Sequence, residues 1–219
     1  MFASTKRAIV VPQSEHLRLC GALALHWGNA RFALPAIDRA ALLLGIATHD
    51  RAFGELDTAE IRSITSADRA AQVERWIATG YANIDAEIVV LNHVRRLMSW
   101  GNETALCARL DARIAELMPQ ATATPDAFAE ADTITDLCDS IAFDFCYEHE
   151  TERRKTVTSG AGEMAELTYR VNGVEITVDP WPFSVTAFEG YVLGYEAEGY
   201  PKHLQPLLMP YRICRAESA

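Results

Sequence analysis

Residues 40–50, AALLLGIATHD, constrain the fold more than any other part of the chain. Up to Ala47 this run contains no charged side chain, so a helix built from it has no polar face to turn toward water. We therefore predict that this helix, which begins near Asp38, lies at the centre of the fold. The run ends on an adjacent histidine and aspartate, His49 and Asp50, so two polar side chains stand at the end of a central helix.

Helical periodicity and capping residues predict the helices that surround this central one. Ser14 and the Thr124-Pro125 pair are favourable helix starts, and Gly28 and Gly80 are favourable helix ends. The further helices are expected over residues 14–27, 66–79, 85–100, 103–118 and 124–149. Residues 51–65 fit neither a helical nor a strand pattern and are expected to be irregular.

Short extended segments are predicted at both ends of the chain. Residues 7–11 (RAIVV) indicate a short strand, and residues 167–178 indicate a hairpin that turns at Asn172-Gly173. Residues 151–162 (TERRKTVTSGAG) resemble a polar loop, and residues 188–195 and 207–214 resemble two further extended runs. The sequence thus predicts a mainly α fold with a small C-terminal antiparallel β appendage, which can pair with the N-terminal strand. We expect a helical domain over 1–150 and the appendage over 151–219.

Composition excludes several classes of function. Lys and Arg number 20 against 30 Asp and Glu, giving a formal net charge of -10, so most of the surface repels nucleic acid. No apolar run approaches the roughly 18 residues that a membrane span needs. The five cysteines are scattered and never spaced as CxxC, which favours a reducing compartment. We expect a cytoplasmic protein with a small-molecule substrate, and the oligomeric state, including a homo-oligomer, stays open.

Polar side chains recur on helix faces that periodicity predicts to be buried. His16 shares a face with Cys20 and Leu23, and His93 lies on a similar apolar face of a later helix. Asp139 lies in the last long helix. A buried carboxylate costs several kcal/mol unless a cation or hydrogen-bond donors compensate it. Side chains of this kind on separate helices are therefore most simply explained if they share one divalent cation, and imidazole with carboxylate suits Mn, Fe, Ni, Zn or, less well, Mg.

The order of these residues resembles the HD phosphohydrolase superfamily. The matching residues are His16 in SEHLRLCGALALHW, His49-Asp50 in LLLGIATHD, and Asp139 in DLCDSIAFDF. The resemblance implies an HD-like helical domain, in which these four residues are the metal ligands. It also implies hydrolysis of phosphomonoesters or phosphodiesters, with Asp50 and His93 in catalysis, since a histidine at the place of His93 commonly binds phosphate or a second metal.

The chain is also similar to DUF3891, a family of bacterial proteins with no assigned activity. The likeness runs through QSEHLRLCGALALHWGN, HDRAFGELD, NHVRRL, CDSIAFDFC and DPWPF. One departure follows the His-Asp pair, where similar proteins carry an acidic residue, Gly and Trp, and this chain has Arg51-Ala52-Phe53. An acidic group that could serve a second metal or activate water is thus missing at that place.

These observations predict a metal-dependent phosphohydrolase acting on a small phosphorylated or nucleotide-like substrate. Two other interpretations stay open: a di-iron oxygenase on the same fold, for which His93 is the only obvious extra ligand, and a degenerate scaffold that binds a ligand or partner without turnover. Each residue also has a simpler reading. His16 can be a partly buried histidine at a helix start, His49-Asp50 a helix end, His93 a buried, hydrogen-bonded histidine, and Asp139 a solvated carboxylate.

Other polar and aromatic residues are assigned structural roles. We expect His26 to pack at the core or its rim, and Asp57 to be a hydrogen-bond acceptor near the site or a helix cap. Arg95-Arg96 is expected to be an exposed pair. Trp181 and Phe183 in DPWPF are expected to hold the β appendage on the helices.

Overall fold

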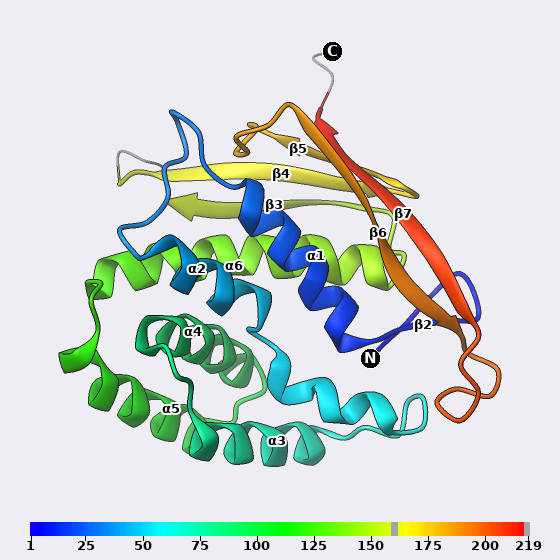
Figure 1. The fold of residues 1–219 in the computed structure, drawn as a ribbon, viewed down its shortest axis with the longest axis horizontal. Helices are drawn as coiled ribbons and strands as arrows, with labels where there is room; N and C mark the ends of the chain where they lie inside the picture. The colour runs from blue at the N-terminus through cyan, green and yellow to red at the C-terminus, as the bar shows by residue number, and fades with distance from the viewer. Residues whose placement is uncertain (159–161, 217–219) are drawn as a thin grey trace.

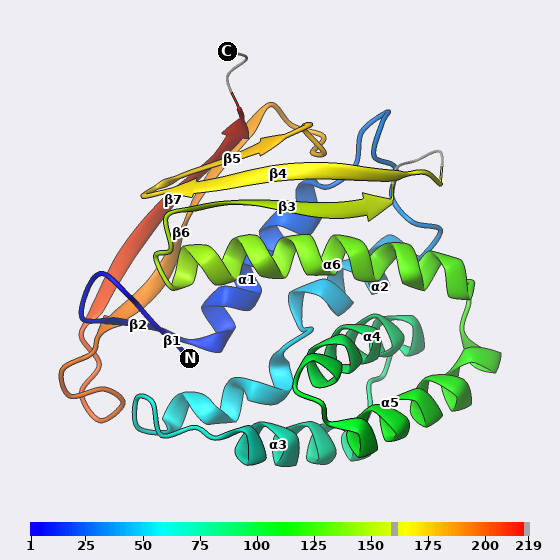
Figure 2. The same ribbon diagram turned by 180° about the vertical axis from the view of Figure 1, so that it is seen from behind.

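A computed structural model describes residues 1–158 and 162–216. A curled sheet covers one side of a group of helices, and α6 runs between the sheet and the remaining helices (Figures 1 and 2). The α-helices are α1 (Gln13–His26), α2 (Arg39–Ala47), α3 (Ser66–Thr79), α4 (Ile84–Trp100), α5 (Thr104–Leu117) and α6 (Pro125–Cys146), joined by the 3-10 helices η1 (Arg51–Thr58) and η2 (Met118–Gln120). The strands are β1 (Phe2–Ala3), β2 (Ile9–Val11), β3 (Thr151–Thr158), β4 (Met164–Asn172), β5 (Glu175–Asp179), β6 (Ala187–Glu196) and β7 (Pro206–Arg215).

The predicted α-helices are all present, with ends within a few residues of those expected. The side chains of Asp38 and Thr124 cap α2 and α6 by accepting backbone amides, as predicted. The expected cap at Ser14 is wrong, because Pro12 precedes α1 and offers no side-chain acceptor. A carboxylate from η1 takes that place: Asp57 Oδ2 accepts the amide of Gln13 at 2.7 Å.

Helix α2 packs between other helices on one side and reaches the surface on the other. It packs between α1 and α4 through a buried face that includes Leu42 and Ile46. Leu44, on the opposite side, is 42% exposed, so one side of this helix faces solvent although it has no charged side chain there. Gly45 explains how closely α2 and α4 approach, since a Cβ at that position would lie 2.7 Å from the Val89 side chain.

The prediction of a mainly α fold with a small β appendage is wrong. The strands form one seven-stranded mixed sheet in the order β1-β2-β6-β7-β5-β4-β3, in which β5 and β7 are parallel and the other neighbours antiparallel. This sheet curls around the helices and makes up a substantial part of the molecule (Figure 1). Two expectations are confirmed: the hairpin at Asn172-Gly173 joins β4 and β5, and the N-terminal strand β2 pairs with β6.

The prediction of a polar loop over residues 151–162 is wrong for its first eight residues, which form strand β3 although they are mostly polar. Strand β3 is the edge strand beside β4, and Val157 is its buried hydrophobic side chain. The remainder of that predicted loop, residues 159–161, lies outside the described residues. The extended runs expected over 188–195 and 207–214 are present as strands β6 and β7, and two glycines lie within β6. A Cβ at Gly190 would overlap the Tyr211 ring, and one at Gly194 would lie 2.9 Å from Ile9, so both glycines permit close packing within the sheet.

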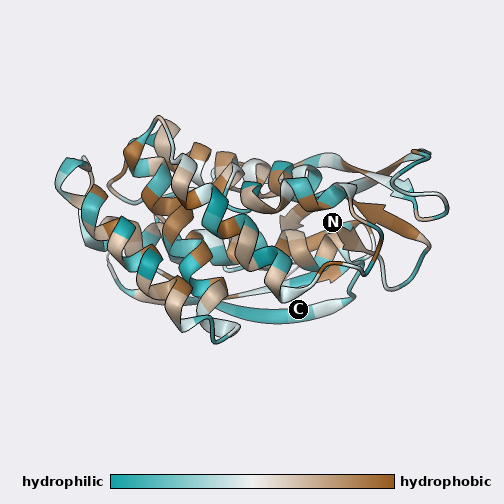
Figure 3. Ribbon diagram, turned by 90° about the horizontal axis from the view of Figure 1, so that it is seen from below, coloured by the Kyte–Doolittle hydropathy of each residue, from teal (hydrophilic) through white to brown (hydrophobic). Residues whose placement is uncertain are grey.

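Helix α6 lies between the sheet and the remaining helices, and this placement positions its part of the candidate site. It contacts α1 and α4 on one side and β3 and β4 on the other. The helices seen from below carry both hydrophobic and hydrophilic residues, as amphipathic helices that cover a core should (Figure 3). Among the described residues, no helix is long and apolar enough to cross a membrane.

Candidate metal centre

Three segments bring the four predicted metal ligands together. His16 comes from α1, His49 and Asp50 from the turn that follows α2, and Asp139 from α6. One nitrogen or oxygen from each of the four lies within 4.8 Å of the others. Both histidines are fully buried, and Asp50 is 7% exposed. The structure therefore brings these four side chains together, while metal binding itself stays a prediction.

Asp139 is the carboxylate that joins the two imidazoles. His16 Nε2 lies 3.1 Å from Asp139 Oδ1, and His49 Nε2 lies 3.6 Å from the same oxygen. Asp50 Oδ2 also approaches both imidazoles, at 3.8 Å from His49 Nε2 and 4.0 Å from His16 Nε2. The two carboxylates thus each face both imidazoles, which is the arrangement that a shared cation requires.

The orientation of His49 leaves one ring nitrogen free for a ligand. His49 Nδ1 lies 2.7 Å from the carbonyl oxygen of Ile46, which can only accept, so this nitrogen carries the hydrogen and donates. His49 Nε2 is buried and has no hydrogen-bond partner within residues 1–158 and 162–216. Such an unpaired buried nitrogen costs free energy, and a cation at this position would remove that cost.

Asp50 is held by neighbours on two helices. Its Oδ2 accepts a hydrogen bond of 2.8 Å from Gln13 Nε2, and its Oδ1 lies 3.1 Å from His93 Nε2. The local backbone makes this possible, because α2 ends at Ala47 and the chain turns into η1 at Asp50. The turn directs two consecutive side chains toward the same place, which an uninterrupted helix would not do.

The tautomer of His93 follows from Arg96. A guanidinium only donates, so Arg96 Nη2, 3.0 Å from His93 Nδ1, makes that nitrogen an acceptor. The hydrogen of His93 must then be on Nε2, which donates it to Asp50 Oδ1. Both ring nitrogens are therefore engaged, and His93 faces Asp50 rather than offering a lone pair to a ligand.

Arg96 is anchored on the acidic side of α6. Its guanidinium bonds Asp132 at 3.1 Å and Asp136 at 2.6 Å, and Lys155 of β3 bonds the second oxygen of Asp136 at 2.8 Å. The expectation of an exposed Arg95-Arg96 pair is correct only for Arg95, because the Arg96 side chain is 18% exposed. A network of ion pairs thus connects the sheet with the candidate site.

The electrostatic field of the cluster favours an added positive charge. Burial lowers the pKa of His49, but Asp50 and Asp139 outweigh this effect and raise it. Burial would raise the pKa of Asp139, yet the hydrogen bond from His16 and the proximity of His49 hold it well below the usual value. For His93, burial and the nearby His49 lower the pKa, consistent with a neutral ring. A divalent cation at this place would be attracted by the same two carboxylates, Asp50 and Asp139.

Cys20 lies beside the cluster and was not selected from the sequence. Its Sγ is 3.7 Å from His16 Nε2, within a second group of potential ligands formed with His49. Burial, and then Asp139, raise the pKa of this thiol well above its usual value, so it is protonated and donates to the carbonyl of Cys138 at 3.5 Å. Cys20 therefore acts as a packing neighbour rather than as a ready thiolate.

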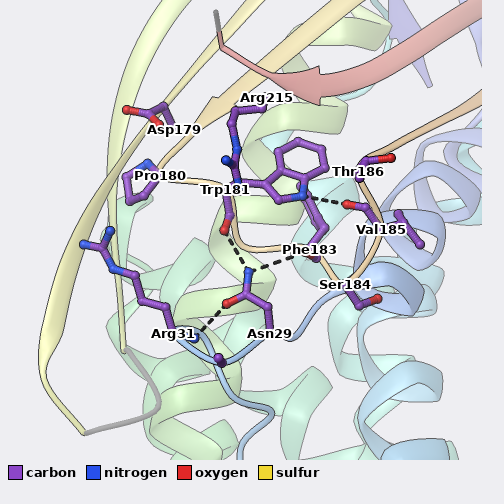
Figure 4. Close-up of a pocket in the computed structure, with 11 residues that line it drawn as sticks. Asn29, Arg31, Asp179, Pro180, Trp181, Phe183, Ser184, Val185, Thr186 and Arg215 are labelled. Atoms are coloured by element: carbon purple, nitrogen blue, oxygen red, sulfur yellow. Dashed lines mark hydrogen bonds between the residues drawn. The ribbon is translucent and has the colours of Figure 1, made fainter. Parts of the chain in front are cut away.

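The remaining candidate residues lie outside the cluster. The His26 ring packs 4.4 Å from that of Phe188, at the contact of α1 with β6. Asn29, Trp181 and Val185 line a cavity of about 840 Å³ (Figure 4). There Asn29 Nδ2 donates to the carbonyl oxygen of Trp181, and Trp181 Nε1 donates to that of Val185. Phe183 forms a β-bridge with Trp27. The DPWPF segment thus fastens the sheet to the end of α1, as the sequence indicates.

Comparison with known proteins adds one result. The family described as "Protein of unknown function (DUF3891)" matches residues 2–78, a segment that contains His16, His49 and Asp50 but ends before His93 and Asp139. No curated protein matches the chain. No solved structure matches it either. The resemblance to the HD superfamily therefore stays a prediction, and the finding that stands is that the chain is similar to DUF3891 over residues 2–78.

Proposed function

We propose that this protein is a metal-dependent phosphohydrolase that holds a divalent ion with His16, His49, Asp50 and Asp139. One observation carries the proposal: His49 Nε2 is buried, lacks a hydrogen-bond partner among the described residues, and faces two carboxylates. The donor set fits the group, because two imidazole nitrogens and two carboxylates suit Mn, Fe, Ni or Zn. The order of the residues along the chain, as in HD phosphohydrolases, supports hydrolysis as the reaction.

The reaction is the transfer of a phosphoryl group to water. The oxygen of water bonds to phosphorus, the P–O bond of the ester breaks, and the alcohol leaves with a proton. When bound, a divalent ion polarises a phosphoryl oxygen and lowers the pKa of water. Asp50 and Asp139 both line an open cavity, so a substrate can reach the carboxylates while the histidines remain fully buried.

His93 takes a supporting role in this proposal. Because Arg96 and Asp50 engage its two ring nitrogens, it orients the Asp50 carboxylate and leaves the second oxygen, Oδ2, facing His16 and His49. The same engagement argues against an oxygenase that uses His93 as an additional iron ligand. We therefore assign His93 as a positioning residue rather than as the phosphate contact that the resemblance implies.

A metal analysis joined to a generic phosphatase assay tests the proposal. We expect the purified protein to contain about one divalent ion per chain and to hydrolyse 4-nitrophenyl phosphate in the presence of Mn, Ni or Fe. Activity should be lost after treatment with a chelator and should return when the ion is restored. A well-folded protein that takes up no metal and hydrolyses no aryl phosphate would contradict the proposal and leave a non-catalytic scaffold.

Replacing Arg96 with Met is expected to weaken metal binding by about 10- to 100-fold, the usual effect of losing a hydrogen bond that orients a ligand. Without the guanidinium, His93 Nδ1 has no donor and the ring can adopt its other tautomer, so Asp50 loses its fixed partner. Arg95→Met is the matched control, because Arg95 is 45% exposed and pairs with Asp111 on α5. Titration calorimetry measures the affinities, and ¹⁵N chemical shifts of His93 report the tautomer. Equal metal affinities in the two variants would refute the positioning role.

A further inference from the structure

The cavity that Asp50 and Asp139 line, beside the candidate metal centre, is small and has mostly apolar walls. It holds about 340 Å³, close to the lower end of the range for small-molecule sites. Its polar lining includes Asp50 and Asp139, the two carboxylates of the candidate metal centre. Hydrophobic side chains from η1, α4, α6 and the N-terminal strand supply most of the remaining wall, among them Phe2, Phe53, Leu97, Met98 and Phe143.

Aromatic rings gather at one side of this cavity. Phe143 lies 4.7 Å from the Tyr147 ring and 5.9 Å from Phe2, measured between centroids. Phe2 also stacks on His16 at 4.6 Å, so the ring that lines the cavity also covers one of the proposed metal ligands. Phe143 is 39% exposed, which leaves apolar surface available to a bound molecule. An apolar group beside the phosphoryl group would be in contact with these rings.

Basic side chains that could bind a polyphosphate are scarce in the cavity. Arg69 is the only lysine or arginine among the residues that line it, all of which lie in the described part of the chain. The Gln13 amide already donates to Asp50, and Glu103 adds a third carboxylate to the lining. A polyphosphate would therefore meet one basic side chain and three carboxylates, so the charge of the lining disfavours it.

We propose, resting on the phosphohydrolase function above, that this site takes phosphomonoesters of small apolar alcohols or phenols. The phosphoryl group would lie against Asp50 and Asp139 through the shared cation, and the organic group would lie against Phe143 and Met98. Arg69 balances the remaining negative charge of the phosphoryl group at the cavity. The limited volume confines the organic part to about one ring or a short alkyl chain.

Phosphonates that differ only in their organic group test this inference, because they keep the phosphoryl oxygens and cannot be hydrolysed at the P–C bond. The metal-loaded protein is titrated with methylphosphonate, 2-hydroxyethylphosphonate and phenylphosphonate. We expect phenylphosphonate to bind at least about tenfold more tightly than the other two, from burial of the ring. Phe143→Ala should weaken phenylphosphonate binding by about fivefold and leave methylphosphonate binding unchanged.

Val174→Ala is the control, since this residue is 55% exposed at the β4–β5 turn and lies outside the cavity lining. Equal affinities for the three phosphonates, or tightest binding of the hydroxyethyl compound, would overturn the apolar specificity alone. Failure of the metal-loaded protein to bind any phosphonate would overturn the proposed function together with this inference. The two failures are thus distinguishable by whether methylphosphonate binds.

Discussion

Replacing Asp139 with Ala is expected to abolish stoichiometric metal binding, and His49→Ala should have the same result. Asp139 is the carboxylate nearest to both imidazoles, and His49 Nε2 faces both carboxylates without a hydrogen-bond partner among the described residues, so either substitution removes a proposed ligand. The affinity should therefore fall by more than the roughly 100-fold that the loss of a supporting hydrogen bond costs. Activity toward aryl phosphates should disappear with the metal.

Elemental analysis of the purified variants measures this result, with circular dichroism to confirm that each is folded. His26→Ala is the matched control for His49→Ala, because His26 packs on Phe188 at the contact of α1 with β6 and is not one of the clustered residues. It should keep the metal content of the original protein. Unchanged metal content in both Asp139→Ala and His49→Ala would defeat the assignment of the site.

The helices could be predicted from the sequence because their signals are local. The capping side chains of Asp38 and Thr124 and the apolar periodicity of each segment are determined within a few residues. The sheet could not be predicted to its full extent. Strand β3 is polar because it lies at an edge, and Gly190 lies in β6 because the Tyr211 ring of the neighbouring strand crosses it. Both facts depend on pairing between distant segments.

The same distinction applies to the candidate site. His16, His49, Asp50 and Asp139 could be selected because a polar residue on an apolar helix face is already unusual in the sequence. The sequence does not predict the supporting roles of Gln13 and Arg96. Gln13 bonds Asp50 across 37 positions of the chain, and Arg96 acts only through its bond to His93. Arg96 carries a local signal in hindsight, being three residues after His93 on one helical face.

Asp144 illustrates how an acidic residue that looks solvated can hold the two layers together. Although Asp144 belongs to a helix with several acids, it is 1% exposed. It accepts hydrogen bonds from the Tyr169 hydroxyl at 2.6 Å and from Arg153 Nε at 2.7 Å, and His149 Nδ1 lies 3.0 Å away. Burial and the adjacent carboxylate raise the pKa of Tyr169, so its hydroxyl stays protonated and donates. These bonds connect α6 with β3 and β4.

Asp144→Ala is therefore expected to lower the free energy of unfolding by about 3 kcal/mol, because it leaves the buried Tyr169 hydroxyl without its acceptor. For a chain of this size the change corresponds to a Tm lower by roughly 6–12 °C. Asp111→Ala, which breaks the exposed pair with Arg95, should cost less than about 1 kcal/mol in the same denaturation experiment.

A double-variant cycle separates the hydrogen bond from a general effect on packing. Tyr169→Phe should be destabilising in the original protein but nearly neutral in the Asp144→Ala background, because the hydroxyl then has no acceptor to lose. Equal costs of Tyr169→Phe in the two backgrounds would show that the bond contributes nothing. Because Asp144 is not one of the clustered ligands, the metal content per folded chain should stay unchanged in both variants, so the layer contact and the metal centre are tested independently.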